Sequence, residues 1–380
     1  ESTTRPLEIA SLAESGDLDV LIWTTTPWTL PANMALAVHP DVDYTILGNS
    51  KNGKHLLVAS DLVQHVQEEL SGNGCSNQDS ETNNNSSAAL PVWSHTGITC
   101  QGIDLIGGNA IPPFGQDLTT VVPIIPGEHV TVESGTGIVH TAPGHGQDDF
   151  VAWSSWLSAT SIATSSNTKT TLLCPVDDEG RYTTDIGEMT NGRLNGLEHR
   201  AVVSGGKDNP SVNQDVIERL KDAGVLLHHQ PHAHRYPYDW RTKQPTIVRA
   251  TTQWFVDLTG TLKDVARSSL VNVDMTPPVS RNRLESMVEG RDNWCISRQR
   301  TWGVPIPVFY RTNDDGLEEI LATEESLNHV ISIVKKKGTD GWWELPTADL
   351  LPPSMSEEEK KEWVRCTDTL DVWFDSGCSW

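Results

Sequence analysis

The chain has 380 residues, enough to bury a sizeable core, and two domains are expected at this length. Hydrophobic residues make up 37% of it, and no apolar run approaches the roughly 18 residues that a membrane-spanning helix needs, so we expect no membrane partner. A formal net charge of −23 argues against a nucleic-acid partner as far as the whole surface is concerned, because phosphates repel negative charge.

Hydrophobic periodicity and turn residues predict the elements of the first half of the chain. Short apolar runs indicate strands, a spacing of three and four residues indicates a helix, and runs of Ser, Thr, Gly and Asn without periodicity indicate loops. The predicted elements are strands at 19–23 and 54–59, a helix at 60–70 capped by Ser60, and polar loops at 71–88 and 158–171.

The second half begins with a change in charge. Amphipathic helices are predicted at 211–224 and 323–337, and Ser356 with Glu359 forms a capping box. Basic residues become frequent after residue 232, where we place the domain boundary. Residues 235–300 carry 11 basic and 7 acidic side chains, a net charge of +4 against −27 for the remainder. Such a basic stripe on an acidic body can bind a polyanion, and a set of surface ion pairs is the alternative.

Residues 135–149 form the most informative stretch: Gly-Thr-Gly-Ile-Val-His-Thr-Ala-Pro-Gly-His-Gly-Gln-Asp-Asp. A β-prone pair leads into a turn rich in glycine and proline, so His140, His145, Asp148 and Asp149 could converge on one pocket. Three interpretations compete. The turn could only cap the following helix with a carboxylate, it could be a metal hydrolase site, or it could be a metal-free pocket in which a carboxylate holds a cationic substrate group.

Two observations weaken the metal interpretation. The spacing of the histidines and carboxylates matches no common zinc motif. The six cysteines are scattered and form no Cys-x-x-Cys pair, which also indicates a reducing compartment. From the residues alone the metal interpretation is less favoured and stays open, and only the resemblance given below implies a site without metal ligands.

A run of threonines follows the first predicted strand. Thr24, Thr25, Thr26 and Thr29 are interrupted by prolines that deny regular strand pairing, so we predict an irregular sheet edge. β-branched residues often mark only the face of a strand. Hydroxyls on an irregular edge can also orient a water molecule or a sugar hydroxyl.

Two further strings complete a recognisable set: Trp-Cys-Ile-Ser-Arg-Gln-Arg-Thr-Trp-Gly-Val-Pro at 294–305 and Asp-Thr-Leu-Asp-Val-Trp-Phe-Asp-Ser-Gly at 368–377. With the threonine run and the turn at 135–149, in this order, they resemble the isoleucyl-tRNA synthetases, class I enzymes of the isoleucine, valine and leucine group. Thr-Trp-Gly-Val-Pro and Val-Trp-Phe-Asp-Ser-Gly favour the isoleucine members.

The resemblance implies an α/β fold. Residues 1–232 would form an editing domain of mixed, β-barrel-like sheets with helices, and residues 233–380 connecting strands and part of a Rossmann-like synthetic domain. The His-x-Gly-His and Lys-Met-Ser-Lys-Ser strings, with which the family binds ATP, do not occur in the sequence, so we do not expect aminoacylation by this chain.

The resemblance also implies activity and partners. The parent enzyme would ligate isoleucine to tRNA(Ile) with ATP and Mg, and this region would hydrolyse misacylated valyl-tRNA(Ile) without a cofactor. A monomer in the cytoplasm is expected, with a mitochondrion or plastid left open. The alternatives are a non-catalytic tRNA-binding fragment and the editing region of a valyl-type relative.

Site residues of the editing region are assigned by alignment to the family. Asp149 aligns with the aspartate that grips the substrate α-ammonium, and His140 with the histidine that shuts out isoleucine. Thr25 and Thr26 are expected to orient the attacking water. Thr24, Thr29 and Asn33 are expected to bind the terminal adenosine. His145 and Asp148 would support the turn, and Tyr182 also aligns near the site.

Three residues of the second half complete the assignment. Trp373 aligns with a residue near the isoleucine pocket of the synthetic site. Arg298 and Arg300 are expected to serve tRNA or the domain junction, and a buried ion pair with Asp371 or Asp375 is the alternative. Asp239 stands where many relatives have a cysteine, so no structural zinc is expected there.

Overall fold

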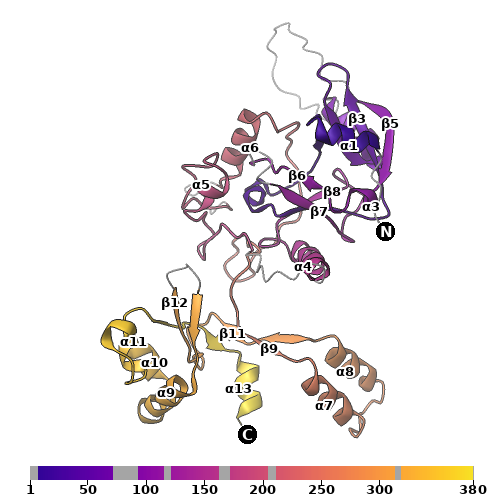
Figure 1. Ribbon diagram of the computed structural model, residues 1–380. Coiled ribbons are helices and arrows are strands. Elements are labelled where there is room, and N and C mark those ends of the chain that lie inside the picture. Colours follow the sequence, from indigo (N-terminus) through magenta and orange to yellow (C-terminus); the bar gives the residue numbers. More distant parts are fainter. Residues whose placement is uncertain are drawn as a thin grey trace. The chain divides into compact units, whose positions relative to one another are not determined.

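The computed structural model describes residues 7–71, 93–114, 121–161, 172–203, 211–312 and 318–379. The chain folds as two compact units, Glu1–Ala250 and Thr251–Trp380 (Figure 1). The expected boundary at 232 marks a change of charge inside the first unit. The chain beyond it stays on that unit, since the Arg249 side chain donates to the carbonyl of Val176 at 2.9 Å and the Ala250 N–H to that of Gly144 at 2.7 Å.

Two four-stranded sheets form the frame of the first unit, with strand orders β1-β4-β3-β5 and β6-β7-β2-β8. Both are mixed, because β1 runs parallel to β4 and β2 parallel to β7 while the other pairs are antiparallel. The strands are β1 (Leu18–Val20), β2 (Ala35–Val38), β3 (Asp43–Asn49), β4 (His55–Ala59), β5 (Trp93–Gln101), β6 (Asn109–Ala110), β7 (Val122–Pro126) and β8 (Ile138–Thr141). The mixed α/β class is confirmed. In the described residues these sheets are open and do not close into a barrel.

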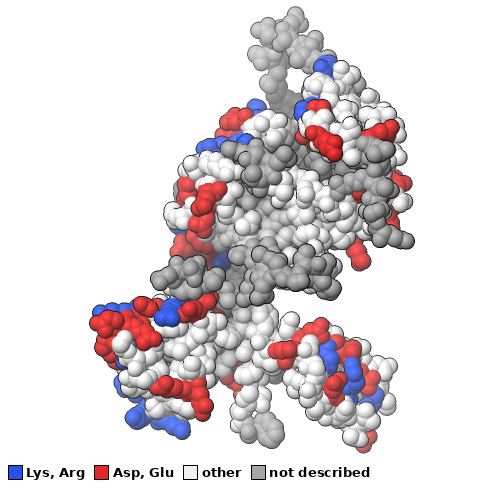
Figure 2. Space-filling view, viewed as in Figure 1, with Lys and Arg blue, Asp and Glu red and all other residues white. Residues whose placement is uncertain are grey.

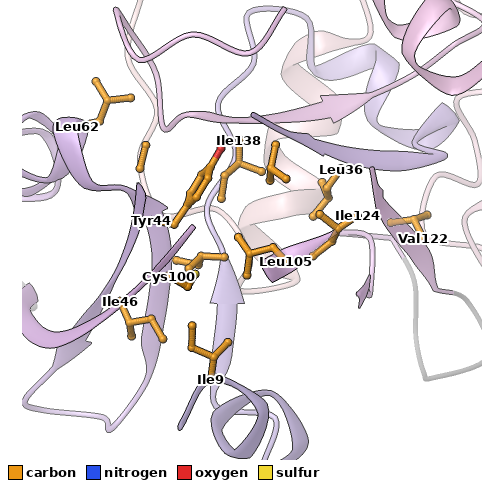
Figure 3. Packing of buried hydrophobic residues seen from close by; sticks show 13 residues of the cluster. Ile9, Leu36, Tyr44, Ile46, Leu62, Cys100, Leu105, Val122, Ile124 and Ile138 are labelled. Carbon is orange, nitrogen blue, oxygen red and sulfur yellow. The ribbon is translucent and has the colours of Figure 1, made fainter. Parts of the chain in front are cut away.

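A hydrophobic cluster lies between the two sheets and fixes the position of β8. Figure 3 shows Tyr44 of β3 beside Ile138 of β8, with Leu36 of β2 nearby. The buried Tyr44 hydroxyl donates to the carbonyl of Gly137 at 2.9 Å. Gly137 has a φ of +73°, and a Cβ there would lie 2.3 Å from the Cβ of Ala59. Only glycine therefore lets β8 begin so close to the first sheet.

The helices predicted at 60–70 and 211–224 are present in the first unit, together with others that were not predicted. They are α1 (Leu7–Glu14), the 3₁₀ helices η1 (Pro27–Ala32) and η2 (Ser60–Leu62), α2 (Val63–Leu70), α3 (Gly102–Leu105), α4 (Gln147–Ser161), α5 (Ile186–Met189) and α6 (Asn213–Asp222). The predicted Ser60 cap is wrong, because the Ser60 hydroxyl bonds to Oγ1 of Thr45 at 2.6 Å and no side-chain cap forms. Of the two predicted loops, residues 72–88 and 162–171 lie outside the described residues, and residues 158–161 belong to α4, so the loop prediction is wrong there.

The second unit contains short strands and helices around its own core, which includes Phe309 and Trp342. The strands are β9 (Phe255–Asp257), β10 (Asn293–Cys295), β11 (Ser297–Arg298), β12 (Phe309–Thr312), β13 (Glu318–Leu321), β14 (Val364–Arg365) and β15 (Thr369–Leu370). The helices are α7 (Thr261–Leu270), α8 (Ser280–Glu289), α9 (Glu324–Lys337), α10 (Asp340–Glu344), α11 (Thr347–Leu350), α12 (Glu357–Lys360) and α13 (Val372–Cys378). The predicted helices at 323–337 and after Ser356 are confirmed, with Thr323 and Ser356 as N-caps.

The strand pairs described in the second unit are all antiparallel. A Rossmann-like sheet has mostly parallel strands, and the described residues of this unit contain no parallel pair. That residues 233–380 include part of a Rossmann-like domain therefore remains a prediction. Across the ranges that the structure describes, no helix combines the length and the apolar character required to cross a membrane.

Candidate functional site

Asp149 ties the start of α4 to the end of β8. Its Oδ2 atom accepts a hydrogen bond of 2.9 Å from the backbone N–H of Ala142, the first residue after the strand. Because this bond runs back from the first turn of α4 to the strand, Asp149 does not act there as a simple cap of its own helix. The carboxylate therefore has a fixed place beside the strand that carries His140.

The other carboxylate oxygen of Asp149 faces a histidine that the sequence analysis missed. Nε2 of His129 lies 3.8 Å from Oδ1 of Asp149, and the two side chains are 23% and 19% exposed. Desolvation raises the pKa of Asp149 above its ordinary value, while the Ala142 hydrogen bond and the nearby His129 oppose that rise. No motif marked His129, which lies in the loop between β7 and β8. The arrangement is a partly exposed carboxylate that can receive a cation.

His140 is buried on β8 and contacts a threonine of the predicted run. Its Nε2 atom lies 2.8 Å from Oγ1 of Thr29, whose own hydroxyl hydrogen is donated to the carbonyl of Thr26 at 2.9 Å. The imidazole must then donate from Nε2, which leaves Nδ1 without a hydrogen. Burial lowers the pKa of His140 to about 4, so the ring is neutral at pH 7. The hydrogen bond to Thr29 gives this neutral ring a fixed orientation on β8.

The threonine run is irregular, as predicted, and leads into η1. Oγ1 of Thr24 accepts from the N–H of Thr26 at 3.1 Å and lies 3.4 Å from its Oγ1. The half-buried Thr25 has no recorded hydrogen bond among the described residues. Asn33 follows η1 and is buried, and its Oδ1 has no partner in the described part of the chain. The lack of strand pairing is as predicted, but the predicted sheet edge is wrong, because the prolines continue the run as the 3₁₀ helix η1, in which Thr29 is buried.

Tyr182 supports η1 from inside the core. It is fully buried, and its hydroxyl donates to the carbonyl of Trp28 at 2.7 Å. Burial raises the pKa of this phenol. Tyr182 holds the backbone of η1, and its hydroxyl is occupied by that contact.

Two glycines are required by close packing in the turn after β8. A Cβ on Gly144 would lie 2.4 Å from the carbonyl oxygen of Leu173, and one on Gly146 would lie 2.6 Å from Oδ2 of Asp149. His145 supports the same turn, because its Nδ1 lies 3.1 Å from the carbonyl of Val248. The turn is therefore held from several sides around Asp149.

The basic stripe is paired in part. Arg298 forms an ion pair with Asp371, and their side chains are 34% and 8% exposed. Of the eleven basic residues at 235–300, five make ion pairs with described residues: Arg249, Lys263, Arg267, Arg281 and Arg298. Figure 2 shows Lys and Arg beside Asp and Glu on the α7–α8 hairpin. Arg300 and Trp373 are exposed. The backbone N–H of Trp373 donates to Oδ1 of Asp371 at 2.8 Å, whereas Arg300 makes no ion pair within the described ranges.

The described residues contain no group of three or more His, Cys, Asp and Glu side chains placed to hold a metal ion. The five described cysteines are free. At position 239, where a structural zinc would need a cysteine, the carboxylate of Asp239 accepts a hydrogen bond of 2.6 Å from the N–H of Thr242. That contact accounts for Asp239 as part of a tight turn.

Comparison with known families gives a match over residues 49–380 to the family described as tRNA synthetases class I (I, L, M and V). The chain belongs to this family. Its members are the enzymes that the four sequence blocks resemble, so the predicted family is confirmed.

Relatives of this synthetase chain agree with the family match. It is 40% identical to the isoleucine--tRNA ligase of Prochlorococcus marinus over 372 residues and 41% identical to that of Rippkaea orientalis over 369 residues, in both cases over 96% of this chain. The chain spans about one third of the length of these relatives, 32% and 33%. A solved editing domain of the P. falciparum cytosolic leucyl-tRNA synthetase matches with a TM-score of 0.36 at 10% identity, over 66% of this chain and 88% of that one. At that score the assignment depends on the sequence matches.

The site residues predicted for this class I synthetase chain fall into groups. Thr29 and His140 are in direct contact, and Asp149 is anchored two residues beyond His140 at Ala142. Thr24 and Thr26 bond to each other in the segment that leads to Thr29. Those of the second unit are Arg298, Arg300 and Trp373. The carboxylate of Asp371 joins two of them, because it pairs with Arg298 through Oδ2 and accepts from the N–H of Trp373 through Oδ1.

Proposed function

We propose that this chain is the editing region of an isoleucyl-tRNA synthetase and hydrolyses valyl-tRNA(Ile). The observation that carries the proposal is the contact between Thr29 and His140 on the strand to which Asp149 is anchored. The similarity to relatives named isoleucine--tRNA ligase supports tRNA(Ile) as the tRNA and isoleucine as the amino acid of the parent enzyme. For the parent enzyme, we propose ligation of isoleucine to tRNA(Ile) with ATP and Mg.

A second site is needed because of a limit on discrimination by binding. One methylene group is worth only about 1–3 kcal/mol, and isoleucine against valine is the standard illustration of that limit. A pocket closed by a rigid wall can admit the smaller side chain and exclude the larger one. The buried ring of His140, fixed by Thr29, supplies such a wall.

The reaction is hydrolysis of an activated ester. The oxygen of water forms a bond to the ester carbonyl carbon, the bond from that carbon to the ribose oxygen breaks, and the ribose oxygen takes a proton. The products are valine and deacylated tRNA. In this proposal Thr24, Thr25 and Thr26 orient the water and the ribose hydroxyls, and Asp149 holds the α-ammonium through charge-assisted hydrogen bonds. The chemistry depends on positioning and on stabilising the developing oxyanion.

Deacylation of valyl-tRNA(Ile) tests this proposal directly. A hydrogen bond to a charged group contributes about 1.5–3 kcal/mol, so Asp149→Ala should lower the rate by roughly 10- to 150-fold. Asp148→Ala is the matched control, because the neighbouring carboxylate is exposed and has no recorded hydrogen bond among the described residues. Equal rates for the wild type and Asp149→Ala would sink the assignment. Binding of tRNA without turnover would favour the non-catalytic alternative.

A further inference from the structure

Five aromatic side chains of the first unit make an unbroken series of ring contacts. Trp23 lies 5.0 Å from His232 between ring centroids, and the next three contacts in the series measure 6.0, 6.0 and 6.2 Å. Four of the residues follow one another at a spacing of two, which indicates an extended chain with these rings on one side. We name this set the aromatic row: Trp23, His232, His234, Tyr236 and Tyr238.

The aromatic row is a surface feature. Trp23 is 42% exposed and Tyr238 61% exposed, both histidines are exposed as well, and Tyr236 is half-buried. No helix or strand is described between α6 and β9, where four of the five residues lie (Figure 1). Single exposed aromatic residues need no explanation, but a contiguous exposed series indicates a binding surface.

Unpaired positive charge accompanies the row. Arg235, Arg241 and Lys243 lie within it or directly after it, and all three are exposed. None of them makes an ion pair in the described ranges, whereas five other basic residues of the stripe do. The carboxylate of Asp239 is held by the N–H of Thr242. The guanidinium of Arg241 lies 4.7 Å from the centroid of the Trp240 ring, another exposed aromatic side chain. In the described residues the row therefore combines exposed rings with cations that have no carboxylate partner, on a chain whose net charge is −23.

We propose that the aromatic row binds single-stranded nucleic acid, with bases stacked on its rings and phosphates beside Arg235, Arg241 and Lys243. Exposed aromatic residues interleaved with basic ones are the usual platform for unpaired bases, since every base has a π-face. The proposal rests on the proposed function and names its occupant. Trp23 directly precedes Thr24, so a nucleic-acid strand that binds the row is led to the threonine run. The occupant is the unpaired 3′ end of the tRNA whose ester is hydrolysed.

Fluorescence anisotropy with a labelled single-stranded RNA octamer and the 380-residue chain tests the proposal. Loss of base stacking on one aromatic ring weakens binding on the order of tenfold. The double variant His234→Ala, Tyr236→Ala should therefore bind at least tenfold more weakly, and Tyr236→Phe should bind like the wild type. Trp302→Ala is the matched control, because this tryptophan is 88% exposed and lies outside the row. Circular dichroism checks that each variant is folded.

Two outcomes overturn the aromatic row as the binding surface. The first is unchanged affinity in the folded double variant, and the second is equal competition by double-stranded RNA, whose bases are not free to stack. The proposed function is judged by a separate measurement, the effect of Asp149→Ala on deacylation. Loss of deacylation in Asp149→Ala with unchanged RNA binding in the double variant rejects the row alone. Weakened RNA binding in the double variant with full deacylation by Asp149→Ala supports the row and rejects the site.

Discussion

Nε2 of His140 lies 2.8 Å from Oγ1 of Thr29, although the two residues are 111 positions apart in the sequence. The register of one strand pair produces this contact. β2 follows η1 directly and pairs antiparallel with β8, which places Leu36 opposite His140 and Ala35 opposite Thr141. The pairing that holds the sheet together therefore also brings the threonine run to the histidine.

Replacement of His140 by alanine should open the pocket to isoleucine. Because one methylene group is worth about 1–3 kcal/mol, removing the ring that excludes it should lower the preference for valyl over isoleucyl ester by roughly tenfold or more. The measurement is kcat/KM for deacylation of valyl-tRNA(Ile) and isoleucyl-tRNA(Ile). Thr29→Val keeps the volume of the side chain and leaves the ring in the pocket, so it should retain most of the preference. If His140→Ala discriminates as well as the wild type, the ring is not the size filter.

His140 should also make stability depend on pH. Its pKa is about 4 in the folded chain against 6.5 ordinarily, so the unfolded chain binds the proton more readily. Stability is then fully present above pH 6.5 and is lost as the pH falls towards 4, by up to about 3 kcal/mol. Urea unfolding of the wild type and of His140→Gln between pH 4 and 7 measures this loss. The Gln variant should show a shallower dependence, and His229→Gln, at an exposed histidine, should behave like the wild type.

Local patterns explain why much of the fold could be predicted. The amphipathic spacing of α6 and α9 is read directly from neighbouring residues, and prolines mark the irregular segment of η1. The turn after β8 was also predicted, because glycine, proline and polar side chains gather within a few positions. These signals depend only on residues close in sequence.

Contacts set by strand register and by loops could not be predicted in the same way. His129 reaches Asp149 from a loop without periodicity, and Ser60 bonds across to Thr45 instead of capping its helix. Both contacts depend on which segments become neighbours in space. Charge and packing also mark different positions in the chain, since the charge changes near residue 232 while the backbone contacts the first unit as far as Ala250.

Replacement of Gly144 by alanine should destabilise the turn around Asp149. The new Cβ would lie 2.4 Å from the backbone oxygen of Leu173, so the backbone has to shift. Overpacking of this kind lowers the free energy of unfolding by about 1–3 kcal/mol. Thermal unfolding should detect this loss as a lower Tm. Gly377→Ala is the matched control, because a Cβ there meets nothing within 4 Å. A Tm for Gly144→Ala equal to that of the wild type would contradict the close packing.

Arg298 forms an ion pair with Asp371 and Arg300 does not, so the two arginines expected to serve tRNA should respond differently to substitution. Arg298 holds a carboxylate that is only 8% exposed and also donates to the carbonyls of Cys295 and Ser297. Arg298→Ala leaves that carboxylate without its partner and should cost about 1–3 kcal/mol, less than a fully buried pair because Arg298 is partly exposed. Arg300 is exposed and makes no recorded contact of this kind in the described residues, so Arg300→Ala should leave the unfolding midpoint unchanged.

Salt dependence of tRNA binding then shows which arginine contacts phosphate. Each phosphate contact adds about 0.7–0.9 to the slope of log K against log salt concentration. Arg300→Ala should lower the magnitude of the slope by about that amount if Arg300 binds tRNA, whereas Arg298→Ala should leave the slope unchanged because its guanidinium is committed to Asp371. A lower slope for a folded Arg298→Ala variant would mean that the ion pair opens to admit a phosphate, and Arg298 would then be a tRNA-binding residue despite its contact with Asp371.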